Sequence, residues 1–170
     1  MATRRKMNDA IQRALSSKII AVVGLSKDPT KPSYDVASYL RTNGFRIIPV
    51  NPTADMILGE KSYKSLPDLP DEIKRELDVV DIFRRSEDVP GVVEEAIRIH
   101  DSYQRPYVVW MQLGIVNQAA AKVAENSGLD VVMDRCMKIE HARLGKHQTL
   151  YPSGPLSDTD ECIRAGTDDI

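Results

Sequence analysis

The residues best suited to chemistry in this sequence follow short apolar runs. They are small residues, amides and cations, gathered in Gly24-Leu25-Ser26-Lys27, Asn51-Pro52, Arg84-Arg85, Gln112-Leu113-Gly114 and Asp134-Arg135-Cys136. Backbone N–H groups, amides and guanidinium groups are the donors that proteins use to hold phosphate. The pattern therefore indicates a binding site for an anionic ligand.

The first of these segments has features of a phosphate-binding loop. Gly24 allows a sharp turn after an apolar run, and Pro32 suits the first position of a helix. Ser26, Lys27 and Lys31 lie between them, where a helix N-terminus favours negative charge. The glycine triplet of dinucleotide sites and the P-loop are both missing from this segment. Both a phosphate site and an ordinary strand-to-helix turn fit the loop alone.

The second segment argues against NAD. A typical NAD site has an acidic residue at the end of the second strand, where it holds the ribose hydroxyls. Asn51 stands there in this chain, between Pro49 and Pro52. Because proline fixes φ and has no N–H, the segment predicts either a stiff wall beside a ligand or simply a rigid turn.

Two adjacent arginines, Arg84 and Arg85, come after the third apolar run. Paired guanidinium groups suit phosphate recognition. Salt bridges to the nearby acids Glu87 and Asp88 are the alternative interpretation, and the sequence does not choose between them.

Cys136 follows the fifth apolar run, so its thiol is expected at the same edge as the other candidates. His141 is five residues farther on, which on a helix places it poorly for a direct pair with Cys136. Cys136 and Cys162 have neither a disulfide framework nor zinc-ligand spacing. No catalytic residue and no metal site are therefore predicted, and Cys136 is kept as a redox thiol only.

Five short runs rich in β-branched residues must position these segments, over residues 19–23, 46–50, 78–83, 107–111 and 130–133. Such runs are typical of buried parallel strands. Helical spacing of apolar residues separates them, and the alternation predicts an α/β, three-layer Rossmann-type fold with a five-stranded, mainly parallel sheet. In such a sheet, ligands bind beyond the carboxyl ends of the strands.

The expected helices are identified by their apolar stripes. An opening helix is predicted from Met7 to Leu15, and another around 36–40. A later helix has a stripe from Val89 to Ile97, with Glu94, Glu95 and Arg98 left for water. The last predicted stripe consists of Val116, Ala119, Ala120, Val123 and Ala124. Residues 51–70 are irregular and predict a crossover without a long helix.

Length and charge limit the class of protein. A chain of 170 residues favours one domain, taken as residues 1–150, and an acidic tail over 151–170 that is mobile or peripherally attached. The net charge of −2 predicts no nucleic-acid partner. The longest apolar run, 19–23, is too short for a membrane span, and no secretory signal is visible, so a cytoplasmic location is expected. Homo-oligomerisation is left open.

In their order, these segments resemble the stand-alone CoA-binding protein family, whose fold is similar to the N-terminal CoA-binding domain of the succinyl-CoA synthetase α subunit. The resemblance runs from about residue 17 to residue 145. It rests on Ile20–Gly24, Lys31–Tyr34, Gly44, Ile48–Pro52, Gly59, Asp81–Arg85, Val109–Gln112, Gly114-Ile115 and Val132–Cys136.

The resemblance implies that coenzyme A lies across the strand ends. Its phosphates would lie near Gly24, Ser26, Lys27 and Lys31. The nucleotide end would be bounded by Pro49, Val50 and Asn51, with Phe83 and Arg84 or Arg85 beside it. The pantetheine arm would run toward Gln112, Gly114 and Cys136.

The resemblance also limits the function that we expect. Acyl-CoA synthesis in the larger family needs an ATP-grasp partner and a phosphorylated histidine, and neither is found in this sequence. We therefore expect a non-catalytic module that binds or senses CoA or an acyl-CoA. The alternative is a thiol-redox protein in which Cys136 forms a mixed disulfide with CoA.

Overall fold

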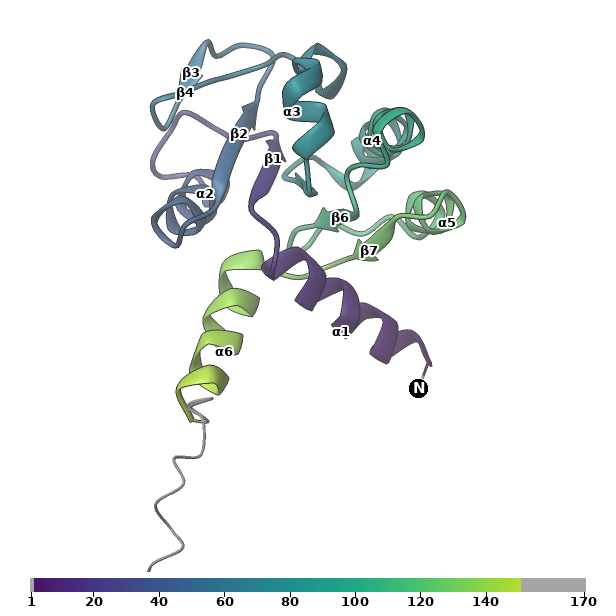
Figure 1. Ribbon diagram of the computed structural model, residues 1–170. Helices are drawn as coiled ribbons and strands as arrows, with labels where there is room; N and C mark the ends of the chain where they lie inside the picture. Colours follow the sequence, from purple (N-terminus) through teal and green to yellow (C-terminus); the bar gives the residue numbers. More distant parts are fainter. Residues whose placement is uncertain (1, 151–170) are drawn as a thin grey trace, which may run out of the picture.

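Five parallel strands form the central sheet, in the order β2-β1-β5-β6-β7 (Figure 1). The computed structural model describes residues 2–150, and the predicted tail lies outside the described residues. The predicted strands and the predicted α/β class are confirmed. The strands are β1 (Ile19–Val23), β2 (Arg46–Val50), β5 (Val79–Ile82), β6 (Val108–Met111) and β7 (Asp130–Val132).

Helices cover both faces of this sheet, which confirms the three layers. One face packs against α1 (Ala2–Leu15), α2 (Pro32–Thr42) and α6 (Met137–Leu150). The other face packs against α3 (Asp71–Glu76), α4 (Val89–Tyr103) and α5 (Gln118–Asn126). The opening helix is confirmed, and Pro32 is the first residue of α2, as predicted.

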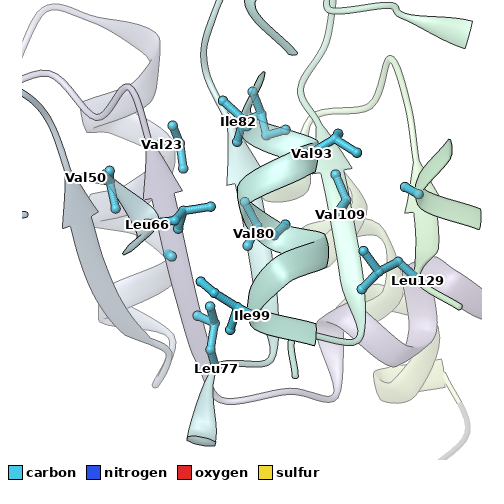
Figure 2. Packing of buried hydrophobic residues seen from close by; sticks show 14 of the residues in the cluster. Val23, Val50, Leu66, Leu77, Val80, Ile82, Val93, Ile99, Val109 and Leu129 are labelled. Carbon is cyan, nitrogen blue, oxygen red and sulfur yellow. The ribbon is translucent and has the colours of Figure 1, made fainter. Parts of the chain in front are cut away.

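The core consists of two clusters, one on each face, because successive strand side chains point to opposite faces. Val80 and Ile82 of β5 and Val109 of β6 belong to the cluster beneath α4, where Val93 and Ile99 meet them (Figure 2). Burial of both strand faces explains why the strands lack polar alternation and could be recognised as apolar runs.

The apolar stripe predicted for α5 is correct for Ala120 and Ala124 and wrong for its other three residues. Val116 and Val123 are exposed, and so is Ala119. The buried residues of α5 are Ala120, Ala121 and Ala124. Their small side chains allow α5 to lie close to α4 and β7, so the helix is buried through alanine and its larger apolar residues face outward.

The final helix, α6, was not predicted as an element because no clear apolar stripe runs along it. It is attached at its start by the buried Met137 and then by His141. The His141 Nδ1 lies 3.0 Å from the Tyr39 hydroxyl of α2, and its ring meets Phe45 edge-on. Within residues 2–150 no helix, α6 included, is both long and apolar enough to cross a membrane.

The irregular segment after β2 contains no long helix, as predicted. It forms a small antiparallel pair, β3 (Met56–Ile57) and β4 (Glu60–Lys61), and a 3-10 turn over Leu66–Asp68. Tyr63 then pairs with Val50 along the outer edge of β2. At the opposite edge of the sheet, α1 packs against β7, and an Arg13–Asp130 salt bridge of 2.9 Å joins them.

Candidate functional site

The order of the strands reverses beside β1, because β2 and β5 flank it on opposite sides. Such a switch point is where open α/β sheets bind ligands. Gly24 lies there with a φ of +88°, and its N–H donates to the Val50 carbonyl at 2.9 Å. A Cβ at this position would lie 2.4 Å from the Phe83 carbonyl oxygen. Only glycine therefore lets the backbones leaving β1 and β5 approach so closely.

The loop after Gly24 is held by its own side chains. The Ser26 N–H donates to Ser33 Oγ at 3.0 Å, and the Asp28 N–H donates to Ser26 Oγ at 3.1 Å. Asp28 in turn accepts hydrogen bonds from the Thr30 N–H and hydroxyl, which lower the pKa of Asp28. In this loop the two predicted phosphate-binding lysines, Lys27 and Lys31, are exposed at the edge of the sheet.

A cavity of about 200 Å³ opens at the switch point, beside Gly24. Apolar side chains from β1, β2 and α4 form its walls, and charged and polar side chains also line it. The lining residues are Val23, Gly24, Val50, Pro52, Lys64, Ser65, Arg84, Val92 and Glu95. The cavity thus combines apolar surface with two cationic side chains, Lys64 and Arg84, and one acidic side chain, Glu95.

The structure separates the two predicted arginines. Arg84 lines the cavity, and within residues 2–150 no acidic side chain forms a salt bridge with it. Arg85 points elsewhere and pairs with Glu87 at 3.0 Å and Asp88 at 3.1 Å. These are the acids that the alternative interpretation named, so that interpretation is confirmed for Arg85 and not for Arg84.

Sequence reasoning placed Glu95 in water, and this was wrong. Glu95 is half-buried on the cavity side of α4, and the Leu66 backbone N–H donates to its carboxylate. Burial raises the pKa of Glu95. Sequence reasoning also missed Lys64 and Ser65, because they follow no strand of the main sheet and lie in the irregular crossover.

Asn51, at the end of β2, is hydrogen-bonded to the segment that follows β1. Its Nδ2 donates to the Leu25 carbonyl at 2.8 Å, and its Oδ1 accepts from the Thr53 N–H at 2.8 Å. Pro49 and Val50 before it are buried in β2. Val50 and Pro52 line the cavity, so the rigid segment around Asn51 lies beside it.

Gln112 lies at the end of β6, but its amide points into the core. It is 3% exposed, and its Nε2 donates to both carboxylate oxygens of Asp81 at 2.8 and 3.0 Å. Its Oε1 lies 3.4 Å from the Met137 N–H at the start of α6. Gln112 thus links β5, β6 and α6 beneath the strand ends.

Gly114 lies in the loop that leaves β6, and this loop is fixed at two points. The Gly114 N–H donates to Asp134 Oδ1 at 2.7 Å, and the Val116 N–H donates to Ser86 Oγ at 3.0 Å. The first bond places the loop beside the end of β7. Leu113, directly before the first anchor, is 65% exposed.

Cys136 is half-buried just before α6, at the same edge of the sheet. The Nδ1 of His141, five residues farther on, is hydrogen-bonded to the Tyr39 hydroxyl. In the described part of the chain, no cluster of three or more histidine, cysteine or acidic residues could hold a metal ion.

At this edge the backbones leaving β1 and β5 approach closely at Gly24, a partly apolar cavity opens, and lysines are exposed. Such an arrangement suits a ligand that has both phosphate groups and an apolar part. Comparison with known proteins gives the corresponding family, because the CoA binding domain model matches residues 18–142. The chain belongs to the CoA binding domain family. The resemblance seen in the sequence is confirmed over nearly the same range.

Curated relatives in this family are of two kinds. The uncharacterized protein YneT of Bacillus subtilis is 41% identical over 140 residues, which cover 82% of this chain and 95% of YneT. The ADP-forming acetate–CoA ligase II of Archaeoglobus fulgidus is 47% identical over 58 residues, which are 33% of this chain and 9% of the ligase. The likeness to the ligase thus concerns a small part of that enzyme.

Solved structures show the same fold at similar identity. A hypothetical protein from Pyrococcus horikoshii superposes with a TM-score of 0.72 at 37% identity, covering 81% of this chain and 91% of that one. The structure of cell-free ID.343 from Thermus thermophilus has a TM-score of 0.71 at 36% identity and covers 81% and 98% of the two chains. The Rossmann-type α/β fold of the CoA binding domain family thus extends over most of this protein.

Proposed function

We propose that this protein binds coenzyme A or an acyl-CoA across the carboxyl ends of its parallel strands. The observation that carries this proposal is the cavity at the switch point, where Gly24 permits a close backbone approach and Arg84 has no acidic partner within residues 2–150. Membership of the CoA binding domain family supports the identity of the ligand.

The phosphates of CoA are assigned to the cationic side of this site. Lys27 and Lys31 are exposed on the loop after Gly24, while Arg84 and Lys64 lie at the cavity. Four positive charges are enough to meet a diphosphate and a 3′-phosphate, and charge-assisted hydrogen bonds to phosphate are strong. Of the two candidate arginines, we assign this role to Arg84, because Arg85 is paired with acids.

The nucleotide end is assigned to the cavity between Val50 and Val92. Apolar walls suit the faces of a base, and Ser65 and Glu95 offer polar groups at its rim. From there, the pantetheine arm would cross the ends of β5 and β6 toward Gly114 and Cys136. Gln112 would hold the strand ends in place rather than contact the arm, since its amide is occupied within the core.

We propose a binding role without catalysis at this edge. The free cysteine at this edge, Cys136, is followed on α6 by His141, whose Nδ1 is hydrogen-bonded to Tyr39. A nucleophile needs an activating base or a lowered pKa to react efficiently. We therefore propose that the site binds coenzyme A through its phosphates and nucleotide and does not react with it.

Replacing Arg84 by alanine should weaken CoA binding by about tenfold to a hundredfold, because one charge-assisted hydrogen bond is lost. Isothermal titration calorimetry measures this directly. Arg85→Ala is the matched control and should change the affinity by less than about threefold, since the Arg85 side chain pairs with Glu87 and Asp88.

Two results would contradict the proposal. Absence of both heat and thermal stabilisation at about 1 mM CoA would exclude CoA as a ligand of useful affinity. Equal affinities of the Arg84→Ala and Arg85→Ala variants would leave CoA binding intact but reject the role assigned to Arg84.

The thiol-redox alternative stays a prediction, favoured by the position of Cys136 at the same edge as the cavity. In this reaction the Cys136 thiolate attacks the disulfide of oxidised CoA, forms one S–S bond and releases one CoA thiolate. After incubation with CoA disulfide, intact-mass measurement should show one CoA adduct that a reductant removes. A Cys136→Ser variant that still gains this adduct would exclude Cys136.

A further inference from the structure

A second hollow lies at the far edge of the sheet, away from the switch point. It is a groove of about 460 Å³, lined by residues of α1, α5 and the β7 region. In Figure 1 the β7 ribbon lies between α1 and α5. Its floor is apolar and comes from all three elements, through Met7, Ala121, Val131 and Met133. No residue of this groove has a role in the function described so far.

One end of the groove opens at the edge where the ligand is expected. Met133 directly follows β7, and Gln118 is the first residue of α5. The next residue after Met133, Asp134, accepts the Gly114 N–H at 2.7 Å. The groove therefore begins beside the β6 loop, toward which the pantetheine arm is assigned.

An ion pair closes the other end. Gln118, Ala121 and Glu125 follow one another on the same face of α5 and line the groove. Glu125 forms a salt bridge of 3.2 Å with Lys6 of α1. Gln118 and Glu125 are seven positions apart along the helix, so the groove is about 10 Å long.

We propose that this groove holds the acyl chain of an acyl-CoA, with the thioester at the Gly114 end. This inference rests on the proposed CoA site and names the ligand class more narrowly. β5, β6 and β7 succeed one another from β1, so the groove begins about 14 Å from Gly24. The pantetheine arm can cross that distance, and the groove length suits a straight acyl chain of about eight carbons.

The apolar floor determines how much an acyl chain should increase the affinity over that of CoA. Burial of one methylene group contributes a factor of about four in affinity, so a chain that fills the groove should bind much more tightly than a short one. Octanoyl-CoA should therefore bind at least about tenfold more tightly than CoA or acetyl-CoA in calorimetric titrations. The polar rim, which includes Lys122, leaves the anionic part of the ligand outside the groove.

Filling the groove tests its location. Ala121→Met places a larger side chain in the floor and should remove the octanoyl-CoA advantage while the affinity for CoA stays unchanged. Met7→Gln makes the opposite wall polar and should reduce the same advantage, and it provides a second test if Ala121→Met fails to fold. Val123→Met is the matched control, because Val123 lies on α5 but is 49% exposed and outside the groove.

The outcomes separate this inference from the function on which it rests. Equal binding of CoA and octanoyl-CoA by the unmodified protein would overturn the acyl groove and leave the CoA site standing. Binding of neither would overturn the CoA site itself. An octanoyl-CoA advantage that survives both groove variants would place the chain elsewhere. A dimer in sedimentation analysis that Ala121→Met dissociates would identify the groove as a subunit interface and overturn the proposal.

Discussion

Replacing Gly24 by alanine should lower the free energy of unfolding by about 2–4 kcal/mol and abolish CoA binding. Two effects add at this position. The φ of +88° is unfavourable for any residue with a Cβ, and that Cβ would meet the Phe83 carbonyl oxygen at 2.4 Å. Since the clash is with backbone, β1 and β5 must separate where the ligand is expected. Chemical denaturation and calorimetric titration measure the two losses.

Gly44→Ala is the control that separates these effects. Gly44 has a φ of +93°, close to that of Gly24, but a Cβ there would find no atom within 4 Å. We expect it to lose only about 1–2 kcal/mol and to bind CoA normally. Equal losses of stability in both variants would show that the approach of β1 and β5 does not constrain Gly24.

The second large effect concerns pH and Asp81. Its side chain is fully buried in β5, and burial raises the pKa of Asp81 to about 7, against the opposing hydrogen bonds from Gln112 and Ile82. The unfolded chain releases this proton near pH 4, so the folded protein binds the proton more tightly. Asp81 therefore lowers the stability increasingly as the pH rises from about 4 to about 7, and the loss is complete above that range.

Asp81→Asn should remove this pH dependence, because the amide is uncharged and of similar size. The difference in unfolding free energy between the variant and the unmodified protein should shift by about 3 kcal/mol in favour of the variant between about pH 5 and about pH 8. Taking the difference at each pH cancels the carboxylates that both proteins share. Urea unfolding across this range provides the measurement.

Asp101→Asn serves as the control, since Asp101 is exposed on α4. Its difference from the unmodified protein should stay constant within about 0.5 kcal/mol over the same range. A constant difference for Asp81→Asn as well would mean that Asp81 does not take up a proton in the folded protein near neutral pH.

The sheet could be predicted from the sequence because its strands are buried on both faces. Ile19–Val23 and Arg46–Val50 were located to the residue, since β-branched runs of that length have few other uses. The strand ends then followed from topology, which placed Gly24, Arg84 and Gly114 at one edge. Periodicity did not locate the buried face of α5, because its contacts are made by alanines.

The details of the site depended on contacts that a linear sequence does not contain. Arg84 and Arg85 are equivalent as a dipeptide, and only the position of Glu87 and Asp88 separates them. Glu95 fits a solvent-facing position on its helix until the crossover at Leu66 covers it. Gln112 was correctly placed at a strand end, but the direction of its side chain depends on Asp81 of the neighbouring strand.

The two outer strands have a consequence for how the protein avoids self-association through its sheet. An uncovered edge strand offers unpaired N–H and C=O groups to a strand of another molecule. On the outer side of β2, the backbone of Tyr63 is hydrogen-bonded to the strand on either side of Val50. Pro49 has no N–H that could donate to another strand there. On β7, the strand is three residues long and α1 lies against it, with Arg13 bound to Asp130. Part of each margin is thus covered against intermolecular β-pairing, by Tyr63 at the end of β2 and by α1 at β7.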